Sequence, residues 1–174
     1  LKGAMVGGAG ECSIIVGGTS NTATSRCSFI GGGNRNSVSG YQSSIVGGAN
    51  NTNSGYNAFI GGGAGNTNSD NNAFIGGGAN NTNSGYNAFI VGGIGNTNSS
   101  NYGGILGGRI NTLSHDYSFI VGVNITSHAS STTHVNNLTV SGSGGTSVVI
   151  MKNLPTSAGV TGQLYNDGGT LKVS

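Results

Sequence analysis

The side chains best suited to recognition in this chain are tyrosines at regular spacing. Tyr41, Tyr56 and Tyr86 stand one or two steps of a common period apart, and the last two are each followed directly by asparagine. An exposed tyrosine ring can stack on a sugar while its hydroxyl forms a hydrogen bond. These three tyrosines are therefore candidate glycan contacts. The same spacing also fits tyrosines that pack at a corner of the fold or against a neighbouring chain.

Cys12 and Cys27 are the only cysteines, and they are separated by one step of the same period. If equivalent residues stack on adjacent coils, their Cα atoms lie about 4.8 Å apart, which is within the range of disulfides. One interpretation is a disulfide at the end of the fold, and the other is two small residues that happen to share a column. Two thiols without a nearby histidine do not predict a metal site.

Catalytic chemistry finds little support. The acidic residues are Glu11, Asp70, Asp116 and Asp167. No two of them recur together within one repeat, which argues against a hydrolase that uses paired carboxylates to process glycans. His115 precedes Asp116, but no nucleophile or second acid accompanies them. We therefore expect no enzymatic activity, no catalytic residues and no cofactor.

A period of 15 organises the chain. One isoleucine occurs in every period without exception, and a glycine follows two positions later. Seven consecutive periods also carry an asparagine four positions after that glycine. The isoleucines are Ile15, Ile30, Ile45, Ile60, Ile75, Ile90, Ile105 and Ile120; the glycines are Gly17, Gly32, Gly47, Gly62, Gly77, Gly92, Gly107 and Gly122; the asparagines are Asn21, Asn36, Asn51, Asn66, Asn81, Asn96 and Asn111. Such a short, unbroken period is typical of a solenoid.

The repeat predicts an all-β fold. It is too short for a pair of helices, and it is rich in Gly, Asn, Ser and Thr, which favour turns. We expect a parallel β-solenoid, or β-roll, of about eight coils and a length of roughly 38 Å. Stacked asparagines should bond from coil to coil. The glycine column fits a turn with positive φ or a close backbone approach. Low-complexity disorder would not keep isoleucine in phase over eight periods.

All five phenylalanines occupy the position before the isoleucine. Neighbouring residues of a strand point to opposite faces, so an inward isoleucine implies an outward phenylalanine. Exposed apolar stripes are rare on monomers. We expect the stripe to be a subunit interface and the isoleucines to form the solenoid core, in a homotrimer. The predicted interface residues are Phe29, Phe59, Phe74, Phe89 and Phe119.

Composition excludes two classes of partner. Charged residues make up 6% of the 174 residues and the net charge is +2, without a basic cluster, so nucleic-acid binding is not expected. The longest apolar run is far too short for a membrane-spanning helix, so we expect no membrane insertion. The chain opens on Leu1-Lys2 without Met or a signal-like segment, so we expect a fragment or a processed product.

The pattern changes near the C-terminus. We divide the chain into a solenoid head, residues 1–128, and a C-terminal β-strand stalk and hairpin module, residues 129–174. In the second part, 130–133 reads as a linker, and 134–140 and 147–151 read as strands. Residues 162–166 and 170–173 flank Asp167-Gly168-Gly169, which is a hairpin signal. This module has no core of its own, so it too should be trimeric.

Two motifs resemble known proteins. Asn57-Ala58-Phe59-Ile60-Gly61 is similar to the NSVAIG coil in the heads of trimeric autotransporter adhesins, which are left-handed parallel β-rolls packed as trimers; the similarity spans roughly residues 13–122. Asn153-Leu154-Pro155, residues 162–167 and residues 171–174 resemble a segment of phage and large-virus fibre proteins. In those chains the segment commonly precedes a chaperone that cleaves itself off after trimerisation.

The resemblance implies a structural fibre or adhesin. Its shaft or head would present a repetitive surface for attachment to a host or cell-surface glycan or receptor. It implies an extracellular location on a virion surface, with a bacterial cell surface and an autotransporter adhesin head as the alternative. A second alternative is an ice-binding solenoid with Thr and Asn ladders. Against it, threonine at positions such as Thr52 is followed by asparagine rather than by a second threonine column.

Overall fold

The computed structural model describes residues 11–136, 164–167 and 170–173. The chain divides into two units, residues 1–137 and 138–174. In the first unit, residues 11–136 form a parallel β-solenoid of about eight turns whose coils repeat with the predicted period, and the described residues contain no helix. The all-β solenoid predicted from the repeat is therefore confirmed. Trimeric packing stays a prediction.

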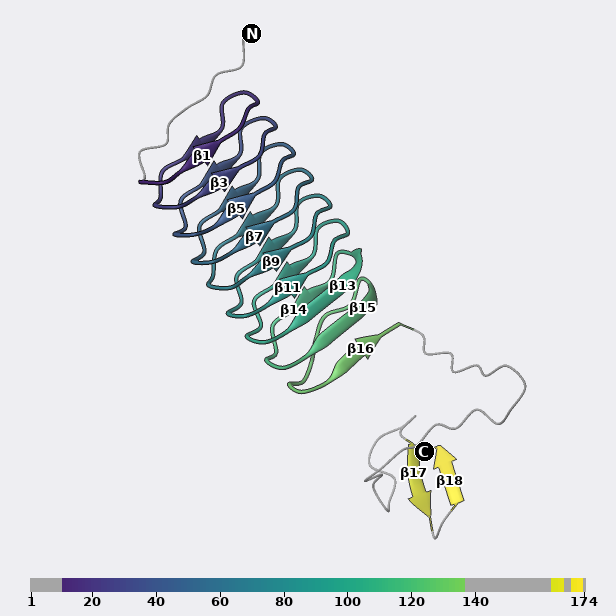
Figure 1. The fold of residues 1–174 in the computed structure, drawn as a ribbon. Helices are drawn as coiled ribbons and strands as arrows, with labels where there is room; N and C mark the ends of the chain where they lie inside the picture. Colours follow the sequence, from purple (N-terminus) through teal and green to yellow (C-terminus); the bar gives the residue numbers. More distant parts are fainter. Residues whose placement is uncertain (1–10, 137–163, 168–169, 174) are drawn as a thin grey trace, which may run out of the picture. The chain divides into compact units, whose positions relative to one another are not determined.

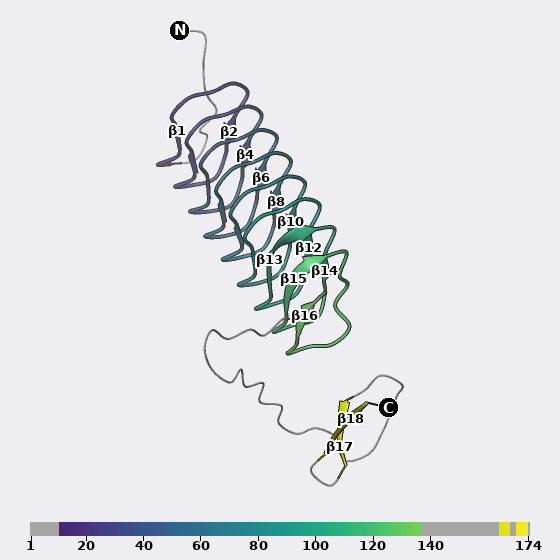
Figure 2. The same cartoon turned by 90° about the vertical axis from the view of Figure 1, so that its right-hand side faces the viewer.

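Two parallel sheets form the two faces of each coil (Figure 1). The nine-stranded sheet contains β1 (Ile14–Ile15), β3 (Phe29–Ile30), β5 (Ser44–Ile45), β7 (Phe59–Ile60), β9 (Phe74–Ile75), β11 (Phe89–Ile90), β13 (Gly104–Arg109), β15 (Phe119–Val123) and β16 (Thr133–Val135). The seven-stranded sheet contains β14 (Thr112–Leu113), β12 (Thr97–Asn98), β10 (Thr82–Asn83), β8 (Thr67–Asn68), β6 (Thr52–Asn53), β4 (Ser37–Val38) and β2 (Thr22–Ala23), and Figure 2 shows it best.

The isoleucine column fills the interior. Ile30, Ile60 and Ile90 have no exposed surface, and neither do the other members between Ile30 and Ile120. Only Ile15, in the first described coil, is partly exposed. The register pairs each isoleucine with its counterpart in the next coil, as in Ile60 with Ile75. The isoleucine column is therefore continuous through the interior, and the core depends on the stacking of successive coils.

Buried asparagines hold the coils together, as the repeat predicted. Asn66 is typical: its Nδ2 donates to Gly62 O at 2.9 Å within its own coil and to Gly78 O at 3.0 Å in the next coil. Its Oδ1 accepts the backbone N–H of Asn81 at 3.0 Å. Every hydrogen-bonding group of this amide is used, so the ladder fixes the turn and links successive coils.

A second inward column varies in step with its neighbour inside the coil. Where it holds Ala, Val or Leu, the residue five positions later is serine, and where it holds asparagine, that residue is alanine or glycine. The pairs are Ala23 with Ser28, Val38 with Ser43, Asn53 with Ala58, Asn68 with Ala73, Asn83 with Ala88, Asn98 with Gly103, and Leu113 with Ser118. The serines bond locally, as Ser43 Oγ does to Gly40 O at 2.6 Å. The asparagines bond both locally and across the interior, as Asn68 Nδ2 does to Ala73 O at 2.7 Å and to Phe59 O at 3.1 Å. Each coil therefore has one buried polar side chain in this pair of columns, either a serine or an asparagine.

The predicted glycine column is constrained at some of its members and not along its whole length. Gly107 has a φ of +142° and a Cβ on Gly122 would collide with the Asn136 side chain, whereas a Cβ on Gly77 would meet nothing within 4 Å. The next glycine along is the constrained one. Gly78 has a φ of +88°, and a Cβ there would collide with the carbonyl oxygen of Gly93. The close approach of successive coils at this turn therefore requires glycine in the Gly78 column.

The solenoid continues beyond the predicted boundary at residue 128. Strand β16 pairs in parallel with β15, and His134 stands opposite Ile120. The segment 130–133, read as a linker, is therefore part of the last coil. That coil is one residue shorter, with Phe119 opposite Thr133, so a strict period does not detect it.

In the second unit, β17 (Leu164–Asp167) and β18 (Thr170–Val173) pair antiparallel, which is the predicted hairpin. The segments 138–140 and 147–151, also predicted as strands, lie outside the described residues.

Candidate functional site

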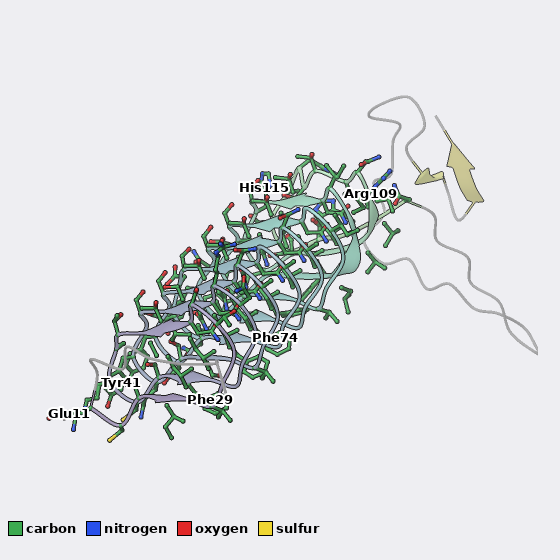
Figure 3. All side chains as sticks on the ribbon, turned by 90° about the horizontal axis from the view of Figure 1, so that it is seen from above. Glu11, Phe29, Tyr41, Phe74, Arg109 and His115 are labelled. Atoms are coloured by element: carbon green, nitrogen blue, oxygen red, sulfur yellow. The ribbon has the colours of Figure 1, made fainter. Side chains whose placement is uncertain are left out.

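An apolar stripe follows the outer face of the nine-stranded sheet. The phenylalanines are half-buried except Phe74, which is 39% exposed. In Figure 3 Phe29 and Phe74 lie along the same side of the solenoid. Exposed aliphatic residues two positions further along the chain extend the row. We define the apolar stripe as the five phenylalanines together with Val16, Val46, Val91, Leu106 and Val121.

Stacking between coils orders the phenylalanine rings. Phe59 and Phe74 have centroids 5.4 Å apart and an interplanar angle of 6°. Phe89 and Phe119 are 6.0 Å apart across the coil of Gly104, and a Cβ on that glycine would collide with the Phe89 ring. The absence of a side chain at Gly104 therefore lets the row continue. Two pairs of rings in the stripe are therefore held by contacts between coils.

The tyrosines form a second ladder, at a turn of the coil. Tyr41 and Tyr56 stack with centroids 5.2 Å apart and an angle of 11°. Tyr102 and Tyr117 stack at 5.1 Å and 1°, and Tyr86 meets Tyr102 edge-on at 5.6 Å. We call these five residues the tyrosine ladder. The rings pack on one another at the corner and also remain open to solvent, with Tyr56 46% and Tyr86 37% exposed.

Tyr102 and Tyr117 were absent from the sequence-based candidates. They stand one position later than the other tyrosines, in a column where φ is positive, at 56° and 57°. The offset separates them from the column of Tyr41, although the two tyrosines are one period apart and were a usable signal.

Rows of hydroxyl groups cover the seven-stranded sheet. In each strand the threonine or serine points outward, the next residue points inward, and the one after points outward again, as in Thr67, Asn68 and Ser69. We define the hydroxyl face as Thr22, Ser37, Thr52, Thr67, Thr82, Thr97 and Thr112 together with Thr24, Ser39, Ser54, Ser69, Ser84, Ser99 and Ser114. None of these residues is charged.

The two cysteines are adjacent free thiols in this structure. The hydrogen bond with Cys12, followed by desolvation, raises the pKa of Cys27. Beside them Arg26 Nε lies 3.2 Å from Glu11 Oε2, in a pair exposed to solvent. A disulfide between Cys12 and Cys27 stays a prediction.

His115 and Asp116 act on the backbone and on neighbouring hydroxyls. Asp116 Oδ1 accepts the Asn101 N–H at 2.8 Å, and His115 Nδ1 lies 2.8 Å from Ser127 Oγ. In residues 11–136 no three potential metal ligands come together. Nor does any helix in the described part of the chain have the length and hydrophobicity needed to cross a bilayer.

Comparison with known proteins adds no identity. No protein-family model matches the chain, and no curated protein matches it significantly. The three surfaces above are therefore the basis for any statement about function.

Proposed function

We propose that the chain is a shaft or head segment of a homotrimeric fibre that attaches to a host or cell surface and performs no catalysis. The observation that carries this proposal is the apolar stripe. It follows the outer face of the nine-stranded sheet, and Phe74 and all its aliphatic members remain exposed in the solenoid from residue 11 to residue 136. A large apolar surface of this kind marks a contact with another chain.

The stripe would supply much of the association energy. Full burial of a phenylalanine or valine side chain contributes roughly 1.5–3 kcal/mol. Four of the phenylalanines are already half-buried, so their further gain is smaller, and exposed residues such as Val16 and Val46 contribute more. Copies that pack around an axis parallel to the rod cover the whole row at once, and a closed rotational assembly leaves no free stripe.

Attachment would use the surface that such an assembly leaves open. The tyrosine ladder and its neighbouring amides lie at a turn, outside the stripe, and offer rings and hydrogen-bonding groups to a glycan. An extracellular virion fibre is the setting that the motif resemblance favours, with a bacterial surface adhesin as the alternative.

The native mass and a matched pair of variants test the assembly. The parent chain should sediment at three times its 17.0 kDa mass. Replacing Phe59, Phe74 and Phe89 together with serine should give unfolded or aggregated chains. The control replaces Thr52, Thr67 and Thr82 with serine and should leave the mass unchanged. A folded monomer with native β signal from the phenylalanine variant would contradict the proposal.

A second candidate, ice binding, gains support from the hydroxyl face. The asparagine beside each threonine points inward, and a second hydroxyl column follows on the outer side, as Ser69 follows Thr67. The result is an uncharged, in-register array with a spacing of about 4.8 Å along the rod. Thermal hysteresis in the parent chain, lost on replacing Thr67 and Thr82 with lysine, would favour this function over attachment.

A further inference from the structure

The tyrosine ladder is interrupted once, at the coil that contains Asp70 and Asn71. In the preceding coil a Gly-Tyr pair ends on Tyr56, and in the following coil the same pair ends on Tyr86. The Asp-Asn pair replaces it in between. Asp70 is also the one acidic residue of the central, nearly identical repeats, residues 40–100. Both departures from the repeat therefore fall on the same turn.

The Asn71 side chain does not fill the place of the missing ring. Its Oδ1 accepts the backbone N–H of Tyr56 at 3.2 Å, which holds the amide against the main chain. The Asn71 N–H in turn donates to Asp70 Oδ1 at 2.6 Å. Within residues 11–136, Asn71 Nδ2 and Asp70 Oδ2 have no protein partner. One donor and one acceptor are therefore free beside the interruption.

The spacing leaves room for one ring. Tyr41 covers one face of Tyr56, so the other face of Tyr56 is turned toward the Asn71 coil. Tyr86 is two coils beyond Tyr56, or about 9.6 Å along the axis. A ring placed midway would lie about 4.8 Å from each tyrosine, within the range of roughly 4.5–7 Å typical of stacked rings. The interval between Tyr56 and Tyr86 therefore has the length needed for one ring.

The surrounding groups favour a sugar over an aromatic ring. A parallel column of asparagines adjoins the interval: Asn72 Nδ2 donates to Asn87 Oδ1 at 2.9 Å, and Asn57 and Asn72 are exposed. Amides and a carboxylate suit the many hydroxyls of a pyranose, whose apolar face stacks on tyrosine. The Asp70 carboxylate disfavours an anionic sugar because like charges repel.

We propose that this interval binds one neutral pyranose ring, stacked between Tyr56 and Tyr86, with Asn71 and Asp70 bonding to its hydroxyls. The inference deepens the proposed glycan attachment and rests on it. A single ring held in this way should bind with a Kd in the millimolar range.

The test is a titration of the full chain, with tyrosine rings isotopically labelled and observed by NMR. The probes are methyl β-galactopyranoside, methyl α-glucopyranoside and methyl α-mannopyranoside, with glucuronic acid as an anionic comparison. At least one neutral probe should shift the ring signals of Tyr56 and Tyr86, and glucuronic acid should shift them less.

Three variants locate the site. Asn71→Tyr completes the ladder, so it should abolish the shifts while the β signal and native mass stay unchanged. Tyr86→Asn removes one wall and should weaken binding about fivefold to tenfold. Tyr117→Asn is the matched control, because the same substitution falls in a column that already holds Asn57 and Asn72, away from the interval. It should bind like the parent.

Specific outcomes would overturn the proposal. They are no shift of Tyr56 and Tyr86 by any neutral probe, unchanged binding in Asn71→Tyr, or larger shifts with p-cresol, which would assign the interval to an aromatic side chain of a protein partner. The native mass of the same sample reports on the assembly alone. A monomer that binds a pyranoside would contradict the proposed homotrimeric fibre and would support the proposed sugar site.

Discussion

Two fully buried asparagines in the same coil should differ sharply in what they contribute to stability. Asn66 and Asn68 both have no exposed surface and stand two positions apart. Alanine at either position removes the same atoms and opens a similar cavity. The difference in cost therefore measures their hydrogen bonds alone.

From the structure we expect Asn66→Ala to lower the free energy of unfolding strongly. The buried N–H of Asn81 would lose its acceptor, and Gly62 O would lose its amide donor. Gly78 O would keep the N–H of Ala64. An unpaired buried group costs about 1–3 kcal/mol, and the half-exposed Gly62 carbonyl adds less, so the polar term is about 2–4 kcal/mol.

The corresponding term for Asn68→Ala is close to zero. Phe59 O would lose its donor, but Asn68 Oδ1, a buried acceptor that has no partner among the described residues, would disappear at the same time. The penalty added at Phe59 O and the penalty removed with Asn68 Oδ1 are of similar size, so they cancel. Ala73 O would lose the Asn68 amide donor at 2.7 Å but would keep the N–H of Phe59 at 2.9 Å. The Asn68→Ala variant should therefore lose only the free energy of unfolding that corresponds to the cavity.

Urea unfolding at a fixed chain concentration, followed by circular dichroism, measures both costs. We expect Asn66→Ala to lose about 2–4 kcal/mol more than Asn68→Ala. Exposed Asn57 is the surface control, and Asn57→Ser should change stability little. Equal losses, or a greater loss at Asn68, would refute the assignment of the two ladders.

Three further expectations test the coil. Gly78→Ala should destabilise the chain by several kcal/mol and Gly77→Ala by about 1 kcal/mol or less, because only the first places a Cβ against Gly93 O; thermal melts compare them. Ile75→Asn should cost several kcal/mol per chain because it buries an unpaired amide, and a variant that melts like the parent would place this column outside the core. At about pH 8.5 Cys27 should be alkylated more slowly than an ordinary thiol, because its raised pKa lowers the thiolate fraction. The Cys12→Ala substitution should speed the alkylation of Cys27. Equal rates for Cys27 in the parent and in this variant would contradict the contact between the two thiols.

The repeat was sufficient to predict the sheets but not the turns. The alternation of Phe and Ile places Ile60 inside and Phe59 outside, because neighbouring strand residues face opposite ways. Nothing in the sequence distinguishes Gly77 from Gly78, since the constraint comes from a carbonyl of the next coil.

The candidate surfaces were predicted unevenly. The Phe row follows from the strand alternation, whereas the interruption at Asn71 gains meaning only when Tyr56 and Tyr86 are known to flank it in space. The last coil was missed because a strict period does not register the loss of one residue before Thr133. The sequence does not show that the Asn68 side chain points inward, because the residues on both sides of it are polar as well.

The Asn66 ladder has a consequence for how such a chain can change its length. Its bonds join equivalent positions of successive coils, as Asn51, Asn66 and Asn81 do in series, so each coil donates an N–H to the coil before it and offers an amide oxygen to the coil after it. Deleting or duplicating one whole repeat brings matching ends together and changes the rod by about 4.8 Å. A genetic change of one complete repeat, in register, would therefore alter the length of the rod without creating a new kind of contact between coils.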